Sequence, residues 1–141
     1  MRKIALFLIV LLTIVSCKKD EPVSPDFSDI FVGTWTATTL KGSGNTISLV
    51  GIKDPALYMV ITRVANNKLN ATLSSYSNGQ TTKSGTLTFD IAKNGDTYTF
   101  TNTTQSSSNS SVYFKYSMLT GELLVGGLSS NGSPIEATFK K

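Results

Sequence analysis

The chain has 141 residues, a formal net charge of +4 and 40% hydrophobic residues, with a single cysteine and no histidine. This length fits one domain whose core is large enough to fold without disulfides. The missing histidine removes the most frequent general base and metal ligand, and the single cysteine excludes an internal disulfide. Lysine and arginine are scattered and form no stripe of the kind that nucleic-acid binding requires, so we expect no nucleic-acid partner.

The first sixteen residues have the layout of a secretory signal. Two positive residues precede the unbroken apolar run "IALFLIVLLTIV" (4–15), and a small residue, Ser16, stands just before Cys17. The run is too short to be a transmembrane helix. We therefore expect residues 1–16 to be a signal peptide that is removed from the mature protein, which would lower the net charge by two units.

The segment around the cysteine resembles the lipobox of bacterial lipoproteins. "IVSC" (14–17) has an aliphatic residue, a tolerated position, a small residue and then Cys. The resemblance implies that Cys17 is the first mature residue, lipidated on its sulfur and acylated on its amine, so that the partner is a membrane. "CKKDE" (17–21) is similar to the sorting signals of Bacteroidota-type surface lipoproteins. This implies an outer-membrane, cell-surface location, with the periplasmic face as the alternative.

A linker and one domain follow the cysteine. "CKKDEPVSPD" (17–26) is rich in charge and proline, which is typical of a flexible linker. The remaining residues, 27–141, form the expected domain. At its start, "PDFSDIF" (25–31) predicts one helical turn with Asp26 or Ser28 as its cap.

Beyond this turn the sequence predicts strand after strand. Thr, Val, Ile, Tyr and Phe dominate, and the strongest turn signals are Asn78-Gly79, Asn94-Gly95 and Asn131-Gly132, which suit type I′ hairpins. Weaker turn signals lie at Asn66-Asn67 and in residues 42–45. Cutting at the turns gives nine expected strands: 31–41, 46–52, 56–65, 68–77, 83–92, 96–104, 112–119, 122–129 and 134–140.

The hydrophobic pattern within these segments defines the fold class. Leu87, Phe89 and Ile91 alternate with polar residues, as in an antiparallel sheet with one buried face. The connections are too short for parallel crossovers. We predict an all-β, antiparallel up-and-down meander of about 8–9 strands closed into a small barrel, with a β-sandwich as the alternative. "LYMVITRV" (57–64) is apolar on both faces, so its outer face is either covered or makes a contact.

The first expected strand carries a second resemblance. "IFVGTWTATTL" (30–40) contains Gly33-x-Trp35 after one helical turn, which resembles the opening motif of lipocalins. The resemblance implies an eight-stranded barrel with Trp35 closing one end and the chain passing beneath it at Gly33. In lipocalins an arginine near the C-terminus stacks on this tryptophan, and this sequence has none there. In a sandwich, Trp35 would be an ordinary core residue.

The residue types argue against catalysis. No serine lies in a Gly-x-Ser-x-Gly motif, and no spacing of carboxylates indicates a glycosidase-type pair. We expect a protein that is not an enzyme and that needs no cofactor and no metal. The remaining carboxylates are expected in turns or on outer faces: Asp54, Asp90, Asp96, Glu122 and Glu136.

Two functions remain. In the first, the barrel of a monomeric, envelope-anchored lipoprotein binds a small apolar or amphipathic ligand in its interior. The candidate ligand-binding residues are Trp35, Phe89, Tyr98, Phe100, Phe114 and Tyr116. In the second, the domain is a non-enzymatic surface module that binds a protein or a glycan through loops or an edge strand.

Overall fold

The computed structural model describes residues 25–104, 112–130 and 132–141. The expected signal peptide (1–16), the expected lipidation site Cys17, most of the linker and residues 105–111 lie outside these residues, as does Asn131 of one expected turn. The fold below therefore concerns the domain expected at 27–141.

One short helix and nine strands make up the described chain, and all of the strands are antiparallel. Nearly all of the expected strands are present, most with ends that differ by only a few residues. The elements are α2 (Ser28–Phe31), β1 (Gly33–Gly42), β2 (Asn45–Ser48), β3 (Ala56–Ala65), β4 (Lys68–Ser77), β5 (Gln80–Asn94), β6 (Thr97–Asn102), β7 (Tyr113–Ser117), β8 (Glu122–Ser130) and β9 (Ser133–Lys140).

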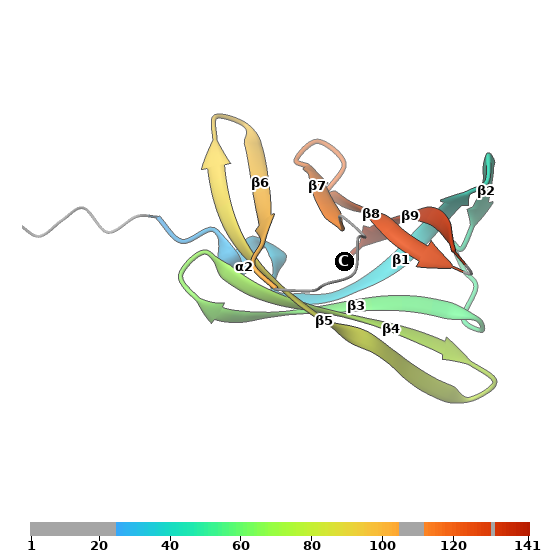
Figure 1. The fold of residues 1–141 in the computed structure, drawn as a ribbon. Coiled ribbons are helices and arrows are strands. Elements are labelled where there is room, and N and C mark those ends of the chain that lie inside the picture. Colours follow the sequence, from blue (N-terminus) through green and yellow to red (C-terminus); the bar gives the residue numbers. More distant parts are fainter. Residues whose placement is uncertain (1–24, 105–111, 131) are drawn as a thin grey trace, which may run out of the picture.

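Eight of the strands form one curved sheet in the order β6-β5-β4-β3-β1-β9-β8-β7 (Figure 1). The sheet curls until its edge strands β6 and β7 approach each other, without a hydrogen-bonded register between them in the described residues. The result is a nearly closed up-and-down barrel, which confirms the predicted fold class. Strand β2 lies outside this path and pairs only with β1.

The expected strand 46–52 is the one that differs most. Its observed counterpart β2 covers only Asn45–Ser48, and all four of its residues are exposed. Ile47 is 58% exposed and Val50 beyond it is 72% exposed, so in this segment only Leu49 packs, partly buried, against the core. Strand β2 forms a hairpin with β1 and is not one of the strands of the barrel wall.

Two turns show the backbone conformation that the sequence predicts. Asn78 and Gly79 have φ angles of 52° and 76°, and they join β4 to β5. Ser43 and Gly44 have φ angles of 50° and 82° in the β1–β2 turn. Positive φ at both central positions is what a type I′ hairpin requires.

The predicted alternation places the core correctly. Inner-face residues in the central part of the long strands are buried or half-buried, whereas their neighbours in sequence point outward. On β3, Met59 and Ile61 are each 2% exposed, but the outer residues Val60 and Val64 are 38% and 52% exposed. The outer face of this strand is therefore not covered within the described residues. The buried core residues are Phe31, Trp35, Ala37, Met59, Ile61, Leu69, Ala71, Phe89, Ile91, Tyr98, Leu123, Val125, Ala137 and Phe139.

Candidate functional site

Helix α2 lies across one end of the barrel and closes it (Figure 1). Its last residue, Phe31, is fully buried and stands at the centre of a cluster of aromatic rings. The ring centroid of Phe31 lies 5.2 Å from that of Tyr98, 5.0 Å from that of Phe100 and 5.1 Å from that of Tyr116, each in an edge-to-face arrangement. Such arrangements stabilise aromatic pairs beyond their buried area, so this end of the barrel is filled.

Trp35 supports the same closed end from the wall. It is 1% exposed, and its indole Nε1 donates a hydrogen bond to the backbone oxygen of Phe31 at 2.7 Å. Lys141 covers the other side, with Nζ 5.6 Å from the indole centroid and 2.9 Å from the backbone oxygen of Ile30. A lysine thus occupies the position of the arginine that the lipocalin resemblance led us to look for. Gly33 has a φ of 135°, and a Cβ there would lie 3.2 Å from Lys141 Cε, so the glycine permits this close passage.

Asp26 attaches the start of the domain to the β3–β4 turn. Its Oδ1 accepts hydrogen bonds from the backbone N–H groups of Ser28 and Asn67, both at 3.0 Å, and its other oxygen pairs with Arg63. These two backbone N–H groups, that of Asn67 foremost, together with the Ser28 hydroxyl and the Arg63 guanidinium, lower the pKa of Asp26 from 3.8 to about 2. The N-cap of α2 is Phe27, which makes no side-chain cap hydrogen bond, so the predicted cap at Asp26 or Ser28 is wrong. Asp26, one residue earlier, instead joins the start of α2 to the β3–β4 turn and so fixes the helix over the barrel end.

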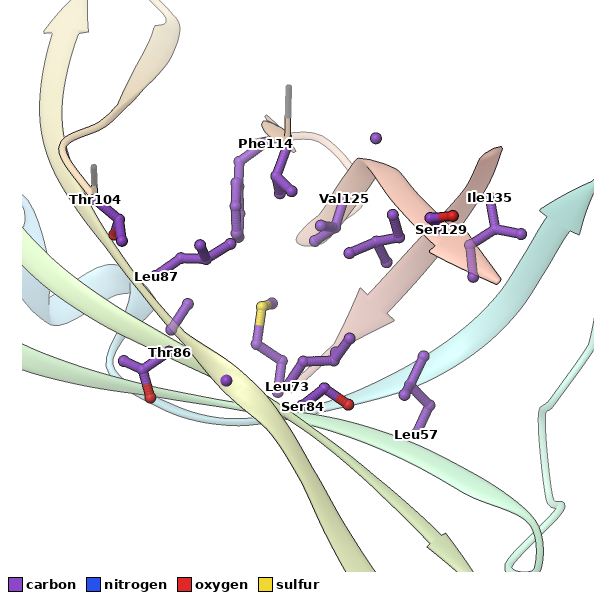
Figure 2. Close-up of a pocket in the computed structure, with 16 residues that line it drawn as sticks. Leu57, Leu73, Ser84, Thr86, Leu87, Thr104, Phe114, Val125, Ser129 and Ile135 are labelled. Carbon is purple, nitrogen blue, oxygen red and sulfur yellow. The ribbon is translucent and has the colours of Figure 1, made fainter. Parts of the chain in front are cut away.

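A cavity of about 450 Å³ occupies the opposite end of the barrel. Small-molecule sites have volumes of about 300–1,000 Å³, so this space is large enough for a small ligand. Figure 2 shows inward side chains from several strands around this common space. The lining residues are Leu57, Met59, Ala71, Leu73, Ser84, Gly85, Thr86, Leu87, Thr104, Val112, Phe114, Val125, Gly127, Leu128, Ser129 and Ile135.

The two ends use different parts of the same strands. On β3, Ala65 accepts a hydrogen bond from Ser28 Oγ of α2 at 3.5 Å, whereas Leu57 at the far end of this strand lines the cavity. On β5, Leu87 lines the cavity, whereas Ile91 lies deeper in the core towards the closed end. The interior is therefore packed with rings at one end and hollow, with mainly aliphatic walls, at the other.

The candidate residues chosen from the sequence fall mostly at the closed end. Trp35, Tyr98, Phe100 and Tyr116 contact one another or Phe31 in the aromatic cluster. Only Phe114 of the candidates lines the cavity. Phe89 packs against it, with the ring centroids 4.2 Å apart. Phe114 and Phe89 thus form the boundary between the packed end and the cavity.

Most of the lining residues are aliphatic, and sequence reasoning did not single them out. Leu57, Leu73 and Leu128 belong to the inner face by the same alternation that identified the aromatic residues. The signal that identifies them is position along the strand: each lies in the half that is distant from α2. Position along a strand can be used in this way only when it is known that the helical turn at 28–31 covers one end of the barrel.

Two further findings concern metal binding and membrane-spanning helices. Within residues 25–104, 112–130 and 132–141, no three His, Cys, Asp or Glu side chains gather closely enough to hold a metal ion. No helix in this part of the chain is long and apolar enough to cross a membrane.

An antiparallel barrel closed at one end and hollow at the other defines the structural class, a small up-and-down barrel with an internal site. Residues 31–126 match the family model of the lipocalin-like domain, and because this match covers well over half of the chain, the protein belongs to that family. Membership indicates ligand binding in general. A solved structure of a redesigned β-barrel is similar at 19% sequence identity and a TM-score of 0.49, over 81% of this chain and 93% of its own. No curated protein matches the sequence.

Proposed function

We propose that this protein is an envelope-anchored lipoprotein whose barrel binds a small apolar or amphipathic ligand. The observation that carries the ligand-binding part is the cavity of about 450 Å³ at the end opposite α2. Its walls come from six strands and are mainly aliphatic, and burial of a ligand's apolar surface there contributes about 25 cal/mol per Å². Family membership supports the same reading.

The anchoring part of the proposal depends on the sequence before the barrel. The lipobox-like "IVSC" (14–17) after an apolar run supports lipidation of Cys17. "CKKDE" (17–21) supports an outer-membrane location on the cell surface, with the periplasmic face as the alternative. Two or three acyl chains hold a protein firmly, whereas one chain holds it marginally.

Titration with a neutral fluorescent probe such as N-phenyl-1-naphthylamine tests the ligand site. We expect saturable binding and a melting temperature that rises with probe concentration, because any ligand of the native state stabilises it. Ala71→Phe, which places a ring in the cavity, should weaken probe binding at least tenfold. Leu57→Trp at the half-buried far end of β3 is a second variant with the same expected effect.

Val60→Phe is the matched control, because Val60 lies on the outer face of β3 and is 38% exposed. It should leave the probe affinity unchanged within about twofold. The melting temperature of each variant without probe shows whether it is folded. If the native protein shows neither saturable binding nor a shift in melting temperature, the ligand-binding proposal is wrong.

That outcome would favour the second candidate, a surface module that binds a protein or a glycan. The exposed apolar residues Val60 and Val64 on the outer face of β3 support it. Because both are far less enclosed than the cavity walls, the internal site has the stronger support.

A further inference from the structure

The chemistry of the cavity lining restricts the class of ligand, if the proposed function holds. Among the lining residues in the described part of the chain there is no Lys, Arg, Asp or Glu. The polar lining side chains are all hydroxyls, of Ser84, Thr86, Thr104 and Ser129. From this lining we infer that the ligand is an uncharged amphiphile, with an apolar tail inside the barrel and a hydroxyl, ester or amide group at the rim.

The positive side chains lie elsewhere. Several are engaged near the closed end or on the outer surface: Arg63 with Asp26, Lys68 with Asp90, Lys140 with Glu122, Lys93 over the Tyr98 ring and Lys141 over the Trp35 ring. The others in the described residues are solvent-exposed and do not line the cavity: Lys41, Lys53, Lys83 and Lys115. A carboxylate that entered the cavity would therefore meet no cation among the described lining residues.

The rim hydroxyls suit a neutral polar group. Ser84, Thr104 and Ser129 come from three different segments. Ser84 and Ser129 are exposed and Thr104 is half-buried, so these hydroxyls lie where the cavity meets solvent. Thr104 Oγ1 accepts a hydrogen bond from the Thr88 backbone N–H at 2.6 Å, so its own hydrogen remains to be donated. Hydroxyls both donate and accept, and they can therefore bind an alcohol, an ester or an amide. The hydroxyl of Thr86 is already paired with Thr72 at 2.7 Å.

An anionic group is disfavoured by its desolvation. Burial of an ionised carboxylate without a paired cation is strongly unfavourable, and the group takes up a proton instead. A fatty acid must then either bind in its protonated form or keep its head in water outside the rim. A fatty alcohol of equal length meets neither restriction.

Competition between matched amphiphiles tests this inference. Dodecanol, methyl dodecanoate and dodecanoate are added as competitors of the neutral probe on the purified full-length protein at pH 7.5, below the solubility limit of the alcohol and the ester and below the critical micelle concentration of the carboxylate. We expect the alcohol and the ester to bind at least tenfold more tightly than the carboxylate. The difference should narrow as the pH approaches the carboxyl pKa, about 4–5.

A rim variant supplies the charge that the lining lacks. Ser84→Lys should raise the affinity for dodecanoate at least fivefold and leave that for dodecanol within twofold. Thr97→Lys, on β6 near the closed end, adds the same net charge and should change neither affinity.

The outcomes separate the two proposals. If the native protein binds dodecanoate as tightly as dodecanol at pH 7.5, the inference of an uncharged ligand is overturned while the ligand-binding proposal stands. If none of the amphiphiles nor the probe binds saturably, the proposed function itself fails. Preference for the alcohol, together with the gain in Ser84→Lys alone, supports both.

Discussion

The ammonium group of Lys141 lies over the indole ring of Trp35, with Nζ 5.6 Å from the ring centroid, and it also donates a hydrogen bond to the backbone oxygen of Ile30 at 2.9 Å. One side chain from the far end of the chain thus holds both the first strand and the helical turn before it. The pair joins the two segments that close the barrel end.

Removal of this charge should weaken the closed end. Lys141→Met keeps most of the aliphatic stem but loses the cation–π contact and the hydrogen bond, so we expect a loss of about 1–2 kcal/mol in the free energy of unfolding. Lys141→Arg should retain most of the stability. Chemical denaturation measures both, with Lys83→Met as an exposed control. Equal stabilities of Lys141→Met and the native chain would contradict the assigned role.

Phe31 should be among the most sensitive positions in the domain. It is fully buried against three rings, so Phe31→Ala should lower the free energy of unfolding by about 3–5 kcal/mol. Ile30→Ala changes the adjacent residue of the same helical turn, which is 39% exposed, and should cost less than about 1 kcal/mol. Similar losses for the two variants would show that α2 does not close the barrel as described.

Asp26 should contribute stability that depends on pH. Its pKa is lowered from 3.8 to about 2 in the folded protein, so the contribution is fully present above about pH 4 and is lost as the pH falls through about 2. Asp26→Asn should be less stable than the native chain at neutral pH, and the difference should shrink between about pH 4 and pH 2. Asp96→Asn, in the β5–β6 turn, is the control for net charge. Thermal melts across this range measure the effect, and a difference independent of pH would refute it.

Gly126 and Tyr113 should be coupled on the outer face. They are paired in register between β7 and β8, and a Cβ on Gly126 would lie 2.1 Å from Tyr113 Cζ. Gly126→Ala should therefore force the ring to move and destabilise the domain by about 1–3 kcal/mol. The same substitution in a Tyr113→Ala background should be much less harmful. A double-mutant cycle measures the coupling, and additive effects would exclude it.

Mass spectrometry tests the proposed lipidation of Cys17. The membrane-extracted protein should carry two or three acyl chains on an N-terminal Cys17, and Cys17→Ser should remain unacylated and leave the membrane fraction. A Cys17→Ser protein of unchanged mass and location would contradict the anchor.

The sequence predicts the strands of this barrel more completely than the site within it. Asn78-Gly79 marks a turn because its backbone conformation is a local property, and alternation assigns Phe89 and Leu87 to the inner face because the strand period is two. Neither signal tells how far along the barrel axis a residue lies. That depends on Phe31, which falls in both the predicted helical turn 25–31 and the predicted strand 31–41 and which the structure places in α2.

The linker joins the barrel at its closed end, opposite the cavity. Asn67 accepts a hydrogen bond from the Phe27 backbone N–H at 2.7 Å and donates one to the Pro25 oxygen at 2.9 Å, so the chain is held at the closed end from Pro25 onward. If Cys17 is the anchor, the eight residue steps to Pro25 span at most about 30 Å. The anchor would then be attached at the end of the barrel opposite the cavity. We propose that a barrel tethered in this way would exchange its ligand with the surrounding water and soluble carriers, because its cavity lies at the end remote from the lipid anchor.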